Sequence, residues 1–482
     1  MNKKLIYFAV ICLTLLFTFF SSVALSDTNT WEHQHLTAAP SQPCVQKDQA
    51  FCTHLPIVSI NTNGASIPGM RGQKEMVRTD LNIYDAQGKN NHLTDEPALT
   101  TLADIRYRGN SSLHFDKKSY LVKLVNADGT ENNKKVLGMP SHNNWVMNGP
   151  FLDKTLMRNY LGMNISAEIM GYAPRVRFVE LFVNEQYQGV YVMMETISQG
   201  NERVNIANYK DGDPFTSYIL RVDRGDTPEN ELNNFTKYAK RMPPNTETHR
   251  FMINVEYPPT RKLTPELKDY IEHDFSKFEK ALFSYDYDDD DYGYESLIDT
   301  QSFVDYFIIN EFFQNYDAIV YSTYFYKDIR GKIHIGPVWD FNNAFGNYME
   351  VAHDGTGFEL HERTWYFMLT KEEAFIDAII NRYRSLRETT LSEEYFMNYI
   401  DETVAYLGDA RDRNFEVWGY SFDPSKLTHW SLLEPYERNI TSYDEAIAQL
   451  KDFIQKRGNW MDENIETLYQ YSHESKNKKF NH

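Results

Sequence analysis

The sequence predicts an α+β protein in which strands and helices occupy separate parts of the chain. Residues 55–195 contain short apolar or alternating segments separated by glycine and asparagine turns, a pattern typical of strands. From residue 300 onward apolar residues recur mainly with helical spacing, and the last such segment begins with a capping box formed by Ser442 and Glu445. Segregated strands and helices indicate two lobes, and the cleft between lobes is the default place for a small-molecule site.

Length, charge and composition restrict the class of protein. The chain has 482 residues, which allows two or three domains or lobes, and its 15% aromatic content is enough for a large core. Three cysteines are too few for a disulfide-dense scaffold. The formal charge of −19 disfavours nucleic acid as a partner, because phosphates attract concentrated positive charge.

The N-terminus has the pattern of a secretory signal. Two lysines precede an apolar run over residues 5–20, and small residues follow at Ala24 and Ser26. We expect cleavage after Ser26, which leaves no membrane span, and a secreted, periplasmic or cell-surface location. An uncleaved anchor is the alternative, because the apolar run is long. The sequence does not indicate whether the envelope has one membrane or two.

Signal cleavage would also remove one cysteine and leave Cys44 and Cys52. An even pair in an oxidising compartment is expected to form a disulfide, and two unpaired thiols are the alternative. The expected division of the chain is a signal (1–26), a polar leader (27–54), a strand-rich part (55–200), a connector (201–299), a helix-rich part (300–470) and a polar tail (471–482).

Within the strand-rich part, Asp153 is a candidate cap for a helix over residues 154–170 that ends at Gly171. In the helix-rich part, residues 303–313 are apolar on most sides and predict a buried helix. Two strands joined by a turn are expected next, over residues 321–326 and 332–339, before the remaining helices. The expected strands of the strand-rich part are residues 55–60, 104–108, 119–124, 177–183 and 189–194, the last two forming a hairpin.

A glycine turn between two expected strands is the first candidate site. Gly109 with small polar neighbours can bring backbone N–H groups close to a phosphate, and a lysine on the next strand can neutralise phosphate charge. A tight hairpin with ordinary surface lysines is the alternative. The candidate phosphate contacts are Arg108, Asn110, Ser111, Lys118 and Lys123.

A pair of aspartates is the second candidate site. Asp317 follows the buried helix, and Asp340 follows the pair of strands after it, so the intervening hairpin would bring them together. One carboxylate at the mouth of a cleft can hold Mg²⁺, and another can orient a nucleophilic hydroxyl. Two aspartates that merely cap helices or turns are the alternative.

Several stretches, taken in order, resemble the spore-coat protein H (CotH) kinases, which are secreted or surface kinases with an atypical protein-kinase-like fold. The resemblance spans residues 55–465. The stretches that carry it include Ile105-Arg-Tyr-Arg-Gly-Asn-Ser-Ser112, Lys117-Lys-Ser-Tyr-Leu-Val-Lys123, Leu137-Gly-Met-Pro140, Asp153-Lys-Thr-Leu-Met-Arg-Asn159, Tyr172-Ala-Pro-Arg-Val-Arg-Phe-Val-Glu-Leu181, Asn315-Tyr-Asp-Ala318, Ser322-Thr-Tyr-Phe-Tyr326, Gly336-Pro-Val-Trp-Asp-Phe341 and Ala344-Phe-Gly-Asn347.

The resemblance implies a two-lobed fold, with a strand-rich N-lobe on the nucleotide side and a helix-rich C-lobe. It also implies that ATP and Mg²⁺ (or Mn²⁺) are cofactors. Asp317 would be the catalytic aspartate that accepts the substrate hydroxyl proton, and Asp340 would bind the metal. Trp339 would be a platform on which adenine stacks.

The resemblance leaves the phosphate-binding lysine open. Lys118 or Lys123 would contact phosphates, with Glu195 as an ion-pair partner. Lys118 and Lys123 are an odd number of residues apart, which places them on opposite faces of a regular strand. At most one of the two lysines therefore faces the cleft. Arg158 is either structural or a further phosphate contact.

The chain departs from the family pattern at the metal site. Asn342 stands where the family often has a second aspartate, and its amide oxygen would bind Mg²⁺ without bringing charge. Ordinary kinases have an asparagine five residues after the catalytic aspartate, and Ser322 stands there. A further metal ligand must then come from Asn342, Asn343 or Asn347.

These features predict a secreted or envelope atypical kinase that transfers the ATP γ-phosphoryl group to Ser or Thr of a surface or secreted protein. The alternative is a catalytically inactive envelope protein on the same fold, for adhesion or glycan contact, because Asn342 weakens the metal site and little free ATP is expected outside the cytoplasm. A third hypothesis, a two-carboxylate glycoside hydrolase, is supported only by the acidic and aromatic content. The sequence indicates neither the protein substrate nor the oligomeric state.

Overall fold

A computed structural model describes residues 33–37, 51–70, 74–86, 88–224, 228–238 and 252–472. The expected signal, its cleavage site, Cys44 and residues 473–482 lie outside this part of the chain. Cys52 is in a disulfide bond, and its pairing with Cys44 stays a prediction. Among the residues that are described, no helix combines the length and the apolar character needed to cross a membrane.

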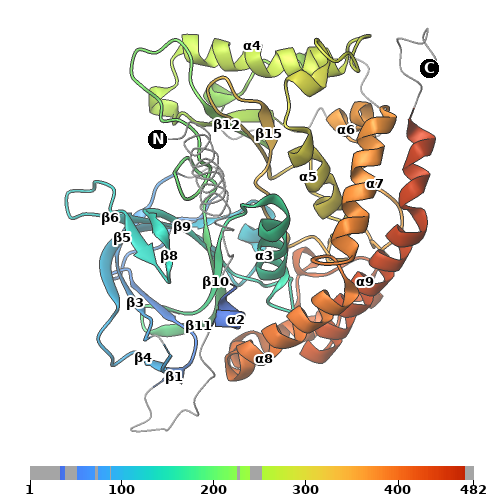
Figure 1. The fold of residues 1–482 in the computed structure, drawn as a ribbon. Coiled ribbons are helices and arrows are strands. Elements are labelled where there is room, and N and C mark those ends of the chain that lie inside the picture. Colours follow the sequence, from blue (N-terminus) through green and yellow to red (C-terminus); the bar gives the residue numbers. More distant parts are fainter. Residues whose placement is uncertain are drawn as a thin grey trace, which may run out of the picture.

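The strand-rich part forms a closed barrel of seven strands (Figure 1). The first strand of the barrel, residues 57–61, pairs in parallel with the first strand of the hairpin after the first long helix. This pairing closes the barrel, and the sequence analysis did not predict the closure. Alternate side chains fill its interior, among them Ile105, Val122 and Trp145. In barrel order the strands are β10 (Val176–Val183), β11 (Gln186–Glu195), β9 (Asn144–Asn148), β6 (Ser119–Val125), β5 (Leu99–Arg108), β3 (Val77–Tyr84) and β2 (Ile57–Asn61).

A second sheet of four strands lies beside the helices and runs in the order β13–β12–β14–β15. Two of its strands, β14 (Thr323–Lys327) and β15 (Ile333–Ile335), are the expected hairpin. The other two, β12 (Tyr218–Asp223) and β13 (Met252–Tyr257), come from the connector, for which no regular strands were expected. Short strand pairs complete the β structure: β1 (Cys52–Thr53) with β4 (Asn91–His92), and β7 (Lys134–Val136) with β8 (Met139–His142).

The C-terminal part is helical, so the predicted mixed α+β class is confirmed. Figure 1 shows α3 between the barrel and the C-terminal helices, and α3 contacts both β10 and α5. The capping box of α9 is present, because the Ser442 hydroxyl accepts a hydrogen bond from the backbone N–H of Glu445 at 3.2 Å. The helices are α2 (Gln34–Thr37), α3 (Arg158–Met170), α4 (Pro265–Leu282), α5 (Thr300–Phe312), α6 (Thr364–Leu369), α7 (Glu373–Arg387), α8 (Glu393–Trp418) and α9 (Tyr443–Asn464).

Helix α3 begins four residues later than the sequence analysis expected. The Asp153 carboxylate accepts hydrogen bonds from the backbone N–H groups of Thr155 (3.1 Å) and Arg158 (2.8 Å), so it stabilises a turn ahead of the helix. The predicted end is confirmed, because Gly171 adopts the left-handed conformation with φ 78°.

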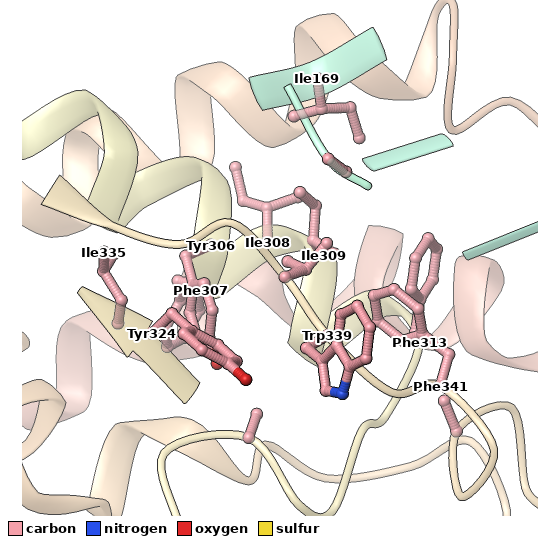
Figure 2. Packing of buried hydrophobic residues seen from close by; sticks show 14 of the residues in the cluster. Ile169, Tyr306, Phe307, Ile308, Ile309, Phe313, Tyr324, Ile335, Trp339 and Phe341 are labelled. Atoms are coloured by element: carbon pink, nitrogen blue, oxygen red, sulfur yellow. The ribbon is translucent and has the colours of Figure 1, made fainter. Parts of the chain in front are cut away.

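Helix α5 is buried on all sides from Phe303 to Phe312, as its apolar sequence predicts, and its core continues to the residues around Asp340. Figure 2 shows Phe313 of this core beside Trp339 and Phe341. On α3, an added Cβ at Gly162 would lie 2.3 Å from the Phe341 ring, so this glycine lets the ring pack directly against the helix. The core therefore anchors the backbone on both sides of Asp340.

Candidate active site

The two aspartates predicted as the core of the site do come together. Asp317 follows the end of α5, and Asp340 follows β15, so the β14–β15 hairpin returns the chain to the same place. The Asn343 amide donates a hydrogen bond to Asp317 Oδ2 at 2.8 Å and joins the loop after Asp340 to Asp317. The negative charge of Asp340 also acts on the Asp317 carboxyl.

Asp317 is in an environment that resists ionisation. Burial, followed by the negative charge of Asp340, raises its pKa from 3.8 to about 6, while the Asn343 hydrogen bond and the positive charge of Arg224 oppose this rise. The carboxyl is therefore mainly ionised at neutral pH, with a pKa close enough to accept a proton during a reaction. This combination suits a general base.

The backbone around both aspartates is held in sparsely populated conformations. Ile319 has φ 71° and Asp340 has φ 63°, and a β-branched residue in the left-handed region costs energy that tertiary contacts must offset. The Thr323 hydroxyl accepts from the Ile319 N–H at 2.8 Å. Arg363 donates to the carbonyl oxygens of the residues on either side of Asp317, at 2.5 and 2.7 Å. These contacts fix the direction in which Asp317 points.

The amide of Asn342 braces Asp340. An ionised carboxylate accepts hydrogen bonds only, so the Asn342 Nδ2 group must face it, and the distance to Asp340 Oδ1 is 2.7 Å. The Asn342 Oδ1 atom then accepts a hydrogen bond from Asn159 at 2.9 Å. A metal bound through this oxygen would share it with Asn159, because an amide oxygen has two lone pairs and one of them is already used.

Asn159 is a residue of the site that the sequence analysis did not single out. It lies on α3, where its Oδ1 accepts from the backbone N–H of Phe341 at 2.7 Å. Its Nδ2 group donates to Asn342 and, at 3.1 Å, to Asn148 at the end of β9. The Asn159 amide thus links α3 to the barrel and to the loop that carries Asp340 through hydrogen bonds. The only signal in the sequence was its place at the end of the family-like stretch 153–159.

The donor set around the aspartates fits Mg²⁺ only in part. Among the described ranges of the chain, no group of three or more His, Cys, Asp or Glu side chains is arranged to hold a metal ion. Asp340 and Asp317 supply two carboxylates whose mutual repulsion a divalent cation would relieve. Mg²⁺ is commonly held by one or two carboxylates together with phosphate oxygens of the substrate, so these two carboxylates could form the protein's part of such a site.

The glycine turn lies beside Trp339. Arg108 ends β5, and its guanidinium carbon is 5.5 Å from the centre of the Trp339 ring. Gly109 has φ 117°, and an added Cβ would lie 1.7 Å from the Ser112 hydroxyl, so only glycine fits there. Asn110 and the exposed Ser111 lead into a short 3-10 helix, Ser111–His114. Of these candidates, Arg108 is the one seen in contact with the Asp340 segment.

The two candidate lysines do not reach Glu195. Lys118 donates to the Leu113 carbonyl within its own loop at 2.7 Å, and it precedes β6, so strand alternation does not apply to it. Lys123 is exposed on β6, because its two neighbours face the barrel interior. The buried Glu195 instead pairs with two arginines, Arg175 at 3.3 Å and Arg203 at 3.7 Å. The expected lysine–Glu195 pair is therefore absent from the described residues.

Arg158 has a structural role in the turn before α3. It forms an ion pair with Asp153 at 2.6 Å, and both side chains are buried. Its guanidinium also donates to the Phe345 carbonyl at 3.4 Å, which joins α3 to the loop after Asp340.

The fold and the site together define a mixed α+β protein with two coupled carboxylates at the junction of a strand barrel and a helical region. The chain belongs to the CotH kinase protein family, whose model matches residues 105–461. It is similar to the inner spore coat protein H of Bacillus subtilis (strain 168), with 19% identity over 371 residues that cover 76% of this chain and 88% of that protein. All the candidate catalytic, metal and nucleotide residues lie inside the matched range, whereas the cysteines lie outside it.

Proposed function

We propose that this protein is a secreted or cell-envelope atypical protein kinase, which transfers the γ-phosphoryl group of ATP to Ser or Thr of a surface or secreted protein. The observation that carries the proposal is the coupling of Asp317 with Asp340 in a chain of the CotH kinase family. In this proposal the barrel is the nucleotide-side lobe of a kinase-like fold, and the helical region is the other lobe.

Asp317 is the general base in the proposed reaction. It takes the proton of the substrate hydroxyl as the oxygen attacks the γ-phosphorus, and its pKa of about 6 leaves it ionised at neutral pH. Asp340 holds Mg²⁺ or Mn²⁺ together with the nucleotide's own phosphate oxygens, and the bound ion supplies charge neutralisation. Asn342 and Asn159 keep the Asp340 carboxylate in place.

Trp339 and Arg108 form the proposed nucleotide contacts. The Trp339 side chain is 8% exposed and its ring lies beside Arg108, so adenine could stack on the indole once the guanidinium moves toward the phosphates. A planar guanidinium matches phosphate geometry, whereas the exposed Lys123 and the loop-bound Lys118 would act only as more distant charges.

Transfer of labelled phosphate from ATP tests the proposal. The mature protein is incubated with labelled ATP, Mg²⁺ or Mn²⁺ and a generic Ser/Thr acceptor. We expect Asp317→Ala to lower transfer by about 10²–10⁴-fold while retaining nucleotide binding, because a general base contributes about that much. Asp340→Ala should lose metal-dependent nucleotide binding as well. Equal transfer by the wild type and both variants would overturn these roles.

An inactive envelope protein on the same fold is the second candidate. The observation that favours it is the Asn342 amide, which donates to Asp340 while its oxygen is held by Asn159. Thermal denaturation with and without Mg·ATP separates the two candidates, since a ligand that binds only the native state raises its stability. No stabilisation together with no label transfer would favour the inactive protein.

A further inference from the structure

A cation from the connector lies beside the segment that follows Asp317. Arg224 comes directly after β12, the connector strand that pairs with β14. This antiparallel ladder pairs Val222 with Thr323, so two residues beyond that pair Arg224 comes opposite Tyr321. The guanidinium carbon of Arg224 is 3.6 Å from the centre of the Tyr321 ring. The pairing of the connector with β14 therefore brings this arginine to the candidate active site.

Tyr321 is attached in turn to the proposed base. Its backbone N–H donates a hydrogen bond to the carbonyl oxygen of Asp317 at 2.7 Å. The positive charge of Arg224 also acts on the Asp317 carboxyl. Arg224 and Asp317 therefore lie in the same part of the site, although they are far apart in the chain.

The guanidinium of Arg224 has donors to spare. The side chain is exposed, and the described residues provide it with neither a hydrogen bond nor an ion pair besides the contact with Tyr321. By contrast, Arg221 of the same strand pairs with Glu256 at 2.8 Å and with Asp223 at 3.5 Å. Contact with an aromatic face holds a guanidinium in place without using its N–H groups, so those of Arg224 are free to bind an acceptor.

Strand β14 also leads from the proposed nucleotide contacts to Asp317. The charge of Arg108, the proposed phosphate contact, acts on the hydroxyl of Tyr324 on β14. Three residues earlier in the chain, Tyr321 is bonded to Asp317 and carries Arg224 on its ring. A chain of phosphates that starts at Arg108 and ends beside Asp317 would therefore bring its last phosphoryl group to Arg224.

The proposed reaction needs a cation at that position. Asp317 and Asp340 already place two carboxylates there, and ATP adds further negative charge. Phosphoryl transfer is accelerated mainly by groups that neutralise the oxygens of the transferred group. Neither candidate lysine meets this need, because Lys118 is bound within its own loop and Lys123 is on the outside of the barrel.

We propose that Arg224 is a further catalytic residue, which donates hydrogen bonds to the γ-phosphoryl oxygens of ATP. This role rests on the proposed kinase function. In the reaction, the substrate hydroxyl oxygen bonds to the γ-phosphorus while the bond from that phosphorus to the β–γ bridging oxygen breaks. The electron pair of the broken bond stays on ADP, and the hydroxyl proton goes to Asp317. Arg224 turns from the Tyr321 ring to the phosphoryl oxygens and neutralises their charge.

Nucleotide affinity tests this contact in the full mature chain. Dissociation constants are measured for Mg·ADP and for Mg·AMP-PNP, an analogue that retains a γ-phosphoryl group. Arg224→Met should weaken AMP-PNP binding about tenfold and leave ADP binding unchanged, because a hydrogen bond to a charged group is lost only where that group is present. Arg330→Met is the matched control, an exposed arginine in the turn at the other end of β14. The proposal is overturned if Arg224→Met binds AMP-PNP as tightly as the wild type.

Turnover distinguishes a phosphate contact from recognition of the acceptor protein. Arg224→Met should lower kcat about 10²–10³-fold and leave the KM for the acceptor unchanged, because the lost donors act on the transferred group. Arg224→Lys should recover part of this loss, since it keeps the charge but not the planar fork. A higher acceptor KM at unchanged kcat would overturn the catalytic role and assign Arg224 to acceptor binding.

These measurements also separate the role of Arg224 from the proposed function. Transfer that is equal in the wild type and Arg224→Met would overturn the role of Arg224 and leave the kinase function standing. A wild type that binds AMP-PNP through Arg224 but transfers no phosphate would keep the γ-phosphate contact and overturn the kinase function. A wild type that binds neither nucleotide would overturn both.

Discussion

At the scale of single residues, the environment that raises the pKa of Asp317, the proposed base, also destabilises the folded protein near neutral pH. Its folded-state pKa of about 6 is above the ordinary value of 3.8. The carboxyl therefore favours the folded state below pH 3.8, and this contribution is lost as the pH rises through about 6. The proposed role of Asp317 and the stability of the fold therefore place opposite demands on this position.

Asp317→Asn should raise the free energy of unfolding by about 1–3 kcal/mol at pH 7.5, because it removes a charge that burial and Asp340 disfavour. The difference should shrink as the pH is lowered below 6. Thermal denaturation across this pH range measures it, with Glu416→Gln on the exposed face of α8 as the control. A variant less stable than the wild type at pH 7.5 would contradict this account of Asp317.

Asn342→Asp should convert a donor that braces Asp340 into a second carboxylate. Without metal, we expect a loss of about 1–3 kcal/mol of stability at neutral pH, because a partly buried hydrogen bond becomes a repulsion between like charges. With Mn²⁺ or Mg²⁺ and nucleotide, the variant should gain more thermal stabilisation than the wild type. An equal gain in the two proteins would show that Asn342 does not limit metal binding.

At the scale of elements, α3 is the helix that connects the barrel to the loop bearing Asp340. Its Asn159 side chain bonds to Asn148 of β9 and to two residues of that loop. The glycine at position 162 brings the Phe341 ring against the same helix. A shift of α3 would therefore displace Asp340.

Asn159→Ala should lower kcat for phosphoryl transfer about 10–100-fold and raise the metal concentration needed, because Phe341 and Asn342 lose their partner on α3. Asn164→Ala is the matched control, since Asn164 is also a buried amide of α3 and donates to the Tyr399 hydroxyl at 2.7 Å. The control should lose stability but keep the metal dependence. An unchanged metal dependence in Asn159→Ala would reduce its role to packing.

The short helix α2 docks an N-terminal segment on the body of the protein. Gln34 accepts from the Phe178 N–H at 2.6 Å and donates to its carbonyl oxygen at 3.1 Å. His35 contacts the Tyr160 hydroxyl of α3 at 2.9 Å. Burial, followed by the charge of His33, lowers the pKa of His35 from 6.5 to about 3. The contribution of this histidine to stability is therefore present above pH 6.5 and is lost as the pH falls.

Acidification from pH 7 to 5 should weaken this docking by about 2 kcal/mol, because His35 must stay neutral to remain buried. Hydrogen exchange at the Phe178 amide, whose acceptor is Gln34, would report the release. His35→Phe should remove the pH dependence, while His273→Phe, at an exposed site on α4, should not. A pH dependence that survives in His35→Phe would assign it to another group.

At the scale of the whole molecule, one continuous core crosses from the barrel to the helices. The same cluster of buried residues includes Phe178 and Val190 of the barrel, Phe307 of α5 and Leu468 near the C-terminus. We therefore expect calorimetry of the mature protein to show a single unfolding transition, with equal calorimetric and van't Hoff enthalpies. Two separate transitions would mean that the barrel and the helical region fold as independent domains.

The sequence by itself determined the features that depend on local pattern. It predicted the α+β class, the buried helix α5, most of the barrel strands and the hairpin that joins Asp317 to Asp340. Each follows from the periodicity of apolar residues or from turn residues close in the chain. The sequence also predicted a turn at Gly109, and the structure gives this glycine a positive φ angle of 117°.

Only the tertiary structure decided which distant residues meet. Parallel pairing of β2 with β10 closes the barrel, the connector supplies β12 and β13, and Asn159 binds the loop after Asp340. The sequence also did not predict the ion-pair partners, since Glu195 pairs with two arginines and not with the candidate lysines. The physical reason is that hydrogen bonds and charge pairs depend on distances in space, and one sequence carries no periodic signal for contacts between residues far apart in the chain.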